Sequence, residues 1–548
     1  MRKLFILLLI SLISGSRVSG QTYMYLIKFS DRVNSPYSVS NPNQFLSQKA
    51  LDRRFKQGIP IKIQDLPPNP NYIDSLKNKG AQILYKTRWF NGAVIVATQS
   101  QKNALLTLPF VSGVEFNTHL KQVSASSSFK VASRNKLEST SSLNYGDATE
   151  QIGLLGVDSM HNAGFHGEGM LIAVLDNGFL NANTISCLDS TFDRNKVLEI
   201  YDFVDNDSTV FAQGGHGTNV LSCMSAFVQN QIIAPAYNSE YVLYRTEDDA
   251  SETKAEEAYW LIAAERADSI GVDVINTSLG YSTFDNPVDN YTSSQMDGNT
   301  TLITRAADLA ASTGMVIVNS AGNSGGSAWN IITAPADGDS VLAIGAVQRN
   351  GTIISFSSRG NPLDPRVKPD VMAVGYQTAL CNTAGVLTTS NGTSFSSPLT
   401  AAMIAGLWQA NPILTSSEIN DVVRRSGHIY QNPNTDYGFG YANFVRADSV
   451  VKSLYTIRTF ETSDAIPSLW ISPESVSLLT MKFDANYSGE SLRVTLINWS
   501  DKLIIKQESF ILSSSTYQMS IPEHTLSNNF VLRLENLSNP KTLGIYKF

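Results

Sequence analysis

Four polar residues of the types that nucleophilic catalysis by a serine requires lie far apart in the chain. Asp176 ends an apolar run in "IAVLDNGF", and His216 opens an apolar helix in "GGHGTNVLSCMSA". Asn323 follows a second apolar run in "SAGNSGG", and Ser394 precedes the predicted helix "SSPLTAAMIAGLWQ". Each residue alone has an ordinary explanation as a turn former or helix cap. Glycine flanks all four, which indicates close backbone approach at each position.

The chemistry explains why these four types belong together. A serine hydroxyl is a weak nucleophile and needs an adjacent base, and histidine suits that task near neutral pH. The imidazole needs a carboxylate to fix its tautomer, and the tetrahedral oxyanion needs backbone or amide donors. Asp176, His216, Asn323 and Ser394 supply these parts. The alternative for Ser394 is a polar loop, because serines and threonines crowd positions 388–397.

Alternating apolar runs and amphipathic helices surround these residues. Strands buried on both faces and separated by helices predict a doubly wound parallel sheet. In such sheets, ligands bind outside the carboxyl ends of the strands. The predicted strands are "MLIAVLD" (170–176), "YVLYRT" (241–246), "VDVINTSLG" (272–280), "MVIVNSAGN" (315–323) and "VLAIGAV" (341–347).

The order Asp, His, Ser, with "DNGF", "HGTNV", "SAGN" and "GTSFSSP", resembles the subtilisin-like serine proteases over residues 150–450. Asn177 stands where that family usually has Ser or Thr, Phe395 where it has Met, and Ser397 where it has Ala. Pro398 is expected in the first turn of the following helix.

The resemblance implies a role for each residue. Ser394 would be the nucleophile, His216 the general base and then the general acid, and Asp176 its orienting carboxylate. Asn323 and the backbone N–H of Ser394 would bind the oxyanion. "NTSLGY" (276–281) is similar to the segment that pairs with the substrate backbone, so Ser278, Leu279, Gly280 and Tyr281 are predicted to bind substrate. An ordinary core strand ending in a turn is the alternative for this segment.

The N-terminal region predicts export and maturation. Residues 1–20 have a basic start, a short apolar run and small residues before Gln21, which is typical of a secretory signal peptide. A retained short anchor is the alternative. Residues 21–118 predict a small α/β unit that resembles the family's prodomain, an intramolecular inhibitor. The Ser-rich stretch 119–146 predicts a linker that contains the maturation cleavage.

The C-terminal region, 456–548, predicts an antiparallel β-sandwich of short alternating strands. Its closing segments, "NFVLRLEN" and "TLGIYKF", resemble the sorting domain of the bacterial type IX secretion pathway, so secretion machinery is a predicted partner. A sandwich that supports the protease or binds substrate is the alternative.

Composition and residue spacing limit which partners, metals and cofactors are expected. The net charge of −7 provides no basic field for nucleic acid, and three cysteines are too few for a disulfide scaffold. The six histidines are scattered, so no catalytic metal is expected. Proteases of this family need no cofactor for the chemistry; they often bind structural calcium, to which no residue is assigned. The acidic run at 245–257 is interpreted as solvated at a helix start.

The sequence therefore predicts an α/β protein with a prodomain (21–118), a linker (119–146), a doubly wound subtilisin-like peptidase domain (147–455) and a β-sandwich (456–548). The predicted function is a secreted serine endopeptidase that cuts proteins or peptides through an acyl-enzyme. The alternatives are a catalytically inactive relative that uses the cleft for binding, and a surface adhesin that acts through the sandwich.

Overall fold

The computed structural model describes most of the chain. Described are residues 21–119, 143–412 and 414–454, and then 457–459, 469–475, 478–483, 488–498, 504–513, 516–520, 530–538 and 541–547. The predicted signal peptide (1–20) and residues 120–142 of the predicted linker lie outside the described residues.

The described residues form two compact units. The first contains the residues up to Pro36, with Pro68–Lys86 and the segment from Phe90 to 119. The second contains Tyr37–Pro67, Thr87–Trp89 and the described residues from 143 onward. The boundary thus crosses the predicted prodomain, because the segments 37–67 and 87–89 make their contacts in the second unit.

The first unit is a four-stranded sheet with two helices. The strand order is β2-β3-β1-β4, and β1 pairs antiparallel with both of its neighbours. Tyr25 and Ile95 are fully buried in its core, within strands whose central residues are buried on both faces. The elements are β1 (Thr22–Phe29), α2 (Pro70–Asn78), β2 (Gln82–Thr87, whose last residue lies in the second unit), β3 (Gly92–Thr98), α3 (Gln99–Leu105) and β4 (Val111–His119).

A seven-stranded sheet, entirely parallel, organises the second unit. Its order is β13-β12-β11-β10-β5-β9-β6. The strands are β5 (Leu171–Asp176), β6 (Val197–Asp202), β9 (Glu240–Arg245), β10 (Val274–Thr277), β11 (Val316–Ser320), β12 (Val341–Val347) and β13 (Val371–Val374). The predicted doubly wound parallel sheet is confirmed, and the sequence analysis missed only its edge strands, β6 and β13.

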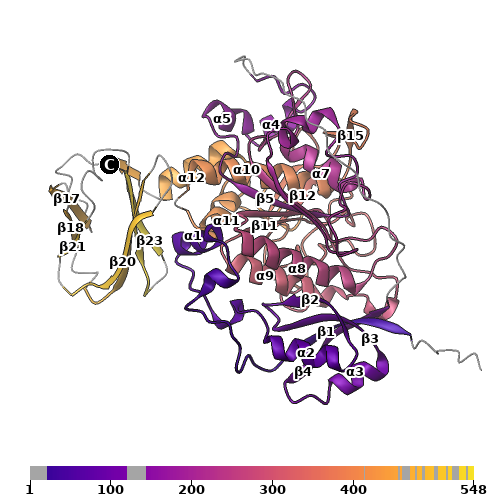
Figure 1. Ribbon diagram of the computed structural model, residues 1–548. Helices are drawn as coiled ribbons and strands as arrows, with labels where there is room; N and C mark the ends of the chain where they lie inside the picture. Colours follow the sequence, from indigo (N-terminus) through magenta and orange to yellow (C-terminus); the bar gives the residue numbers. More distant parts are fainter. Residues whose placement is uncertain are drawn as a thin grey trace, which may run out of the picture. The chain divides into compact units, whose positions relative to one another are not determined.

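Helices cover both faces of this sheet. Figure 1 shows α7 and α10 on one side and α8 and α9 on the other. These helices are α7 (His216–Ser225), α8 (Lys254–Ile270), α9 (Leu302–Ser312) and α10 (Thr393–Ala410). The others are α1 (Gln48–Gln57), α4 (Thr149–Leu154), α5 (Val157–Asn162), α6 (Asp189–Phe192), α11 (Ser416–Arg425) and α12 (Phe444–Leu454). Short strands complete the unit: β7 (Phe227–Val228), β8 (Ile232–Ile233), β14 (Thr378–Cys381) and β15 (Leu387–Ser390).

The C-terminal strands form two sheets around a shared apolar core. One has the order β16-β23-β22-β19-β20 and the other β17-β18-β21. Buried side chains from both, such as Met481, Val494 and Leu532, pack into one cluster. Every strand pair described there is antiparallel except β16 with β23. The strands are β16 (Ile457–Thr459), β17 (Leu469–Ser475), β18 (Leu478–Phe483), β19 (Ser491–Asn498), β20 (Ile504–Ile511), β21 (Thr516–Ser520), β22 (Phe530–Asn536) and β23 (Lys541–Lys547).

Two further observations concern the described residues. No helix among them is both long and apolar enough to cross a bilayer. Cys187, Cys223 and Cys381 are all buried as free thiols.

Candidate active site

The candidate site lies where the strand order of the parallel sheet reverses. From β5, the first strand in chain order, the sheet continues through β9 and β6 on one side and through β10 to β13 on the other. A crevice is expected outside the carboxyl ends of β5 and β10, because the connections leave in opposite directions there. Asp176 is the last residue of β5, and Ser278 follows β10 directly.

The carboxylate and the imidazole form a close pair. His216 is the first residue of α7, and its Nδ1–H donates to Asp176 Oδ1 over 2.8 Å. Asp176 is 3% exposed, whereas a third of the His216 side chain is exposed. With Nδ1 holding the proton, Nε2 is free to accept one from a nucleophile.

Asn177 ties this pair to a neighbouring acidic loop. Its Oδ1 accepts from Gly217 N at 3.3 Å, and its Nδ2 donates to Asp249 Oδ1 at 2.8 Å. Its own backbone N–H donates to Asp176 Oδ1 at 2.8 Å. The residue that departs from the family pattern therefore keeps a short polar side chain that fixes the start of α7.

Ser394 differs from the hydroxyls around it. It lies in the first turn of α10 and stays partly exposed, while Ser396 and Ser397 are fully buried. Those two hydroxyls donate to Thr393 O and Asn276 Oδ1, both at 2.9 Å. Among the described residues, Ser394 Oγ has one long contact, of 3.4 Å to Ser278 O. The polar-loop alternative is wrong from residue 393 onward, because these residues form a helix that presents one hydroxyl to solvent.

Pro398 lies in the second turn of α10, not the first. A proline has no N–H, so it cannot bond the carbonyl four residues earlier, which belongs to Ser394. That carbonyl instead accepts from Ser278 Oγ at 2.9 Å. Because the Ser394 carbonyl lacks its helical partner, it is free for this hydrogen bond, which joins Ser394 to the residue after β10.

Two donors converge on an open space above Gly392. Asn323 Oδ1 accepts from the backbone N–H and the hydroxyl of Thr393, at 2.9 and 3.0 Å, which turns its Nδ2 donor outward. A Cβ built on Gly392 would lie 3.6 Å from Ser394 N and 3.7 Å from Asn323 Nδ2. With φ of +151°, position 392 also disfavours other residues. Gly392 keeps this space open, a role that the sequence analysis missed although it noted the flanking glycines.

The surrounding charges favour a protonated His216. Burial acts to lower its pKa, but the charge and hydrogen bond of Asp176, followed by the charges of Asp249 and Glu247, leave the pKa raised above its ordinary value. The imidazole therefore loses its proton at a higher pH than an ordinary histidine does.

The acidic run at 245–257 leads into the start of α8, as predicted, and Asp249 and Glu252 are exposed, but other parts of the run are buried, so the expected solvation was wrong there. Glu256 is 2% exposed and accepts from Thr253 N and Asp248 N at 2.8 and 2.9 Å, which caps α8. Glu257 is fully buried and accepts from Tyr291 Oη at 2.8 Å. Burial raises the pKa of Glu256 to about 10.

The predicted substrate-binding residues have unequal exposure. Gly280 is exposed and Leu279 half-buried, and the carbonyl of Leu279 accepts from Asn319 Nδ2 at 3.0 Å. Ser278 is 7% exposed and Tyr281 is 1% exposed. Tyr281 pairs its backbone with Ala334, and its hydroxyl donates to Glu247. Tyr281 therefore anchors the segment in the protein interior, while Gly280 and part of Leu279 are accessible to solvent.

In the part of the chain that the structure describes, no three or more His, Cys, Asp or Glu side chains lie close enough together to hold a metal ion.

Two family models match the chain. The subtilase family matches residues 167–442, about half of the chain, and the peptidase S8 propeptide domain of Bacteroidota matches residues 24–134. The propeptide match covers all of the first unit except its beginning, and it also covers the segments 37–67 and 87–89 of the second unit.

Curated relatives agree with these matches. Subtilisin DY of Bacillus licheniformis is 30% identical over 275 residues, which cover 49% of this chain and 88% of that protein. Subtilisin E of Bacillus subtilis (strain 168) is 26% identical over 372 residues, covering 68% and 84%. The crystal structure of MycP1 from the ESX-1 type VII secretion system aligns with a TM-score of 0.43 and 18% identity, covering 58% of this chain and 90% of that one. The chain belongs to the subtilase family and is a subtilisin-like serine peptidase with an S8 propeptide domain.

Proposed function

We propose that this chain is an exported endopeptidase that cuts peptide bonds through an acyl-enzyme, with Ser394 as nucleophile. The observation that carries the proposal is the contrast at α10: Ser394 is partly exposed beside its own backbone N–H and Asn323 Nδ2, whereas Ser396 and Ser397 are buried and hydrogen-bonded. His216, held by Asp176, supplies the base.

The proposed mechanism uses these residues in sequence. His216 Nε2 takes the proton of Ser394 Oγ as the oxygen attacks the scissile carbonyl, and Asp176 stabilises the imidazolium. The oxyanion enters the space above Gly392, where Ser394 N and Asn323 Nδ2 donate to it. His216 then protonates the leaving amine, and a water hydrolyses the acyl-enzyme by the same route in reverse. Leu279 and Gly280 offer backbone for pairing with an extended substrate.

The family members need no cofactor for this chemistry, and we assign no calcium site. We propose the boundaries 1–20 for the signal peptide, 21–118 for the prodomain, 119–146 for the linker, 147–455 for the peptidase domain and 456–548 for the sandwich. The prodomain would act as an intramolecular inhibitor, and cleavage in the linker would precede its release. Secretion through a type IX pathway, guided by the C-terminal strands, follows from their resemblance to its sorting domain.

A fluorophosphonate probe tests the nucleophile. Labelling of the processed wild-type protein and its absence in Ser394→Ala are expected, and peptide hydrolysis should fall by about 10⁶-fold, as in subtilisin, the reference case for this triad. Ser396→Ala is the matched control, because its buried hydroxyl bonds only within α10. Mass spectrometry should place a new N-terminus within 119–146.

Absence of labelling in correctly processed wild-type protein would favour the inactive, cleft-binding relative. An adhesin would instead lose its function on truncation near Ser449, whereas a peptidase should keep its activity on small substrates.

A further inference from the structure

Residues 37–67, hereafter the arm, belong to the propeptide match but make their contacts in the second unit. The arm carries α1, which lies against the end of α8. Ser47 N donates to Ser269 O at 2.8 Å, and Gln57 Nε2 donates to Gly314 O at 2.7 Å. A Cβ on Gly271, the residue that ends α8, would lie only 2.7 Å from Lys49 Cγ.

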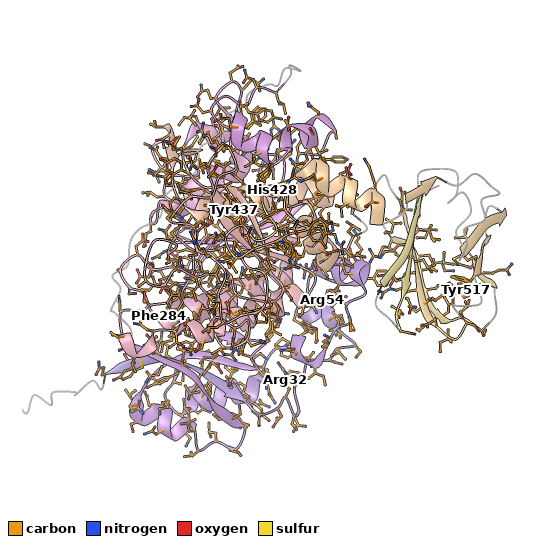
Figure 2. All side chains as sticks on the ribbon, turned by 180° about the vertical axis from the view of Figure 1, so that it is seen from behind. Arg32, Arg54, Phe284, His428, Tyr437 and Tyr517 are labelled. Carbon is orange, nitrogen blue, oxygen red and sulfur yellow. The ribbon has the colours of Figure 1, made fainter. Side chains whose placement is uncertain are left out.

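Three arginines converge on one buried carboxylate of α8. Arg53 Nη2 donates to Asp268 Oδ1 at 2.5 Å, and Arg54 Nη2 donates to Asp268 Oδ2 at 2.7 Å. Arg88, from the segment 87–89, donates to the same Oδ2 at 3.0 Å. Asp268 is fully buried, and Arg54, labelled in Figure 2, has a side chain that is 2% exposed. We call this group of three arginines around Asp268 the arginine clasp.

Glu265, one turn earlier on α8, accepts from the same propeptide segment. Its carboxylate receives the hydroxyl of Thr87 at 2.5 Å and the backbone N–H groups of Arg88 and Trp89 at 2.7 and 3.1 Å. Two acidic side chains of the peptidase domain are therefore satisfied by propeptide donors.

The clasp also completes the C-terminal end of α8. Arg88 Nη2 donates to Glu265 O at 2.8 Å, and Arg53 Nη1 donates to Val272 O just beyond the helix. Cations are favoured at this negative end of a helix, whereas the carboxylates of Glu265 and Asp268 are not. The charges of this region balance. Three arginines face three carboxylates, those of Asp268, Glu265 and Asp65, and Asp65 of the arm pairs with Arg54 at 2.8 Å.

Removing the propeptide would leave Asp268 and Glu265 at the helix end without these partners. Breaking one side of a buried ion pair is far more costly than breaking an exposed one, because a charge stays uncompensated. Burial acts to raise the pKa of Asp268, but the three guanidiniums hold it below its ordinary value.

We infer that the arginine clasp is the interaction that keeps the cleaved propeptide bound to the peptidase domain, and that it therefore sets how fast the arm departs after the linker is cut. This inference rests on the proposed maturation by linker cleavage. The vacated acidic pair on α8 is then a docking site whose partner is an arginine-bearing arm of this same chain.

Lys49 provides an internal contrast. It lies on the same helix with the same charge, but its ammonium is 3.6 Å from Asp273 and 3.9 Å from Glu240, and its side chain is 38% exposed. Exposed pairs of this kind contribute little to binding.

The test uses the full chain with Ser394→Ala, so that no sample cleaves itself, and a recognition sequence for an external protease inserted within 119–146. After cleavage by that protease, size-exclusion chromatography and native mass spectrometry follow the rate at which the N-terminal fragment leaves. Arg53→Gln, Arg54→Gln and Asp268→Asn should each raise this rate by about 100-fold or more. Lys49→Gln, the matched control, should raise it by less than about 5-fold.

Equal rates for Arg53→Gln and Lys49→Gln would overturn the inference. Where a glutamine or asparagine variant gives no folded chain, Arg53→Lys keeps the charge but loses the fork that reaches Asp268 and Val272 together; about 10-fold faster release is expected, and a wild-type rate would contradict the clasp. Since every sample lacks Ser394, a negative result concerns the clasp alone, and failed fluorophosphonate labelling concerns the catalytic proposal alone.

Discussion

Two buried carboxylates of the second unit, Asp176 and Asp268, have opposite surroundings. Asp268 is contacted by three guanidiniums, and both of its oxygens accept hydrogen bonds. Asp176 gives Oδ1 to His216 and Asn177, while its Oδ2 has no hydrogen-bond partner among the described residues. An incompletely satisfied buried carboxylate lowers stability but stabilises an imidazolium when one forms. The difference agrees with the roles proposed above, propeptide binding for Asp268 and chemistry for Asp176.

The largest expected effect tests the catalytic side of this comparison. Asp176→Asn should lower kcat/KM by about 10⁴-fold, because an amide fixes the wrong tautomer of His216. The melting temperature should change by no more than about 2 °C, since the change removes a poorly satisfied buried charge. Both are measured on protein cut through the inserted linker site. A loss of stability as large as that of Asp268→Asn would remove the distinction.

The open space beside Ser394 gives the next effect. Gly392→Ala places a methyl group between the two proposed oxyanion donors and forces an alanine into a strained φ. A loss in kcat of about 10²–10³-fold is expected, similar to removal of one such donor. Steady-state kinetics are measured on Gly392→Ala, on Asn323→Ala and on their combination. The two losses in kcat should not add in the combined variant, and additive losses would show that Gly392 acts elsewhere.

The proposed role of Asp268 in binding the arm predicts a change in the hydrogen-exchange protection of α1. In the uncut chain, Asp268→Asn should lower the hydrogen-exchange protection of α1 by about 100-fold, because Arg53 and Arg54 lose their shared anion. Lys49→Gln should leave this protection within about 3-fold of wild type. Mass spectrometry of peptides covering 48–57 measures both, and unchanged protection in Asp268→Asn would mean that other contacts hold the arm.

The smallest effect concerns pH. The charge of Asp249 stabilises protonated His216, so Asp249→Asn should lower the pKa of the imidazole. The base form then persists to lower pH, and the acid limb of the kcat/KM profile should move to lower pH, most clearly at low salt. Asp421→Asn, on the distant helix α11, should leave the profile unchanged. A shift to higher pH would reverse the sign of the argument.

The sequence predicted the active-site side of this comparison better than the binding side. Asp176, His216, Asn323 and Ser394 lie in short glycine-containing turns after strands or before helices, and such turns are visible in the local pattern. The two edge strands were missed because β13 has only four residues and β6 is half-buried, with Leu198 52% exposed.

The clasp has no local signature. Arg53 and Arg54 fall in a stretch that predicts only an amphipathic helix, and Asp268 resembles any acidic residue near a helix end. Their contact joins residues 215 positions apart in the chain. Only the tertiary structure brings these charges together, so periodicity and composition could not reveal them.

The hydrogen bond from Ser278 Oγ to Ser394 O, made available by the proline at 398, links segments 116 residues apart. One of these segments carries the proposed nucleophile, and the other carries the backbone proposed to pair with substrate. In that proposal, a shift of the loop after β10 on peptide binding would be transmitted to the start of α10 through this bond. The attacking oxygen would then follow the scissile carbon, so that peptides of different bulk could be cut without a new alignment for each.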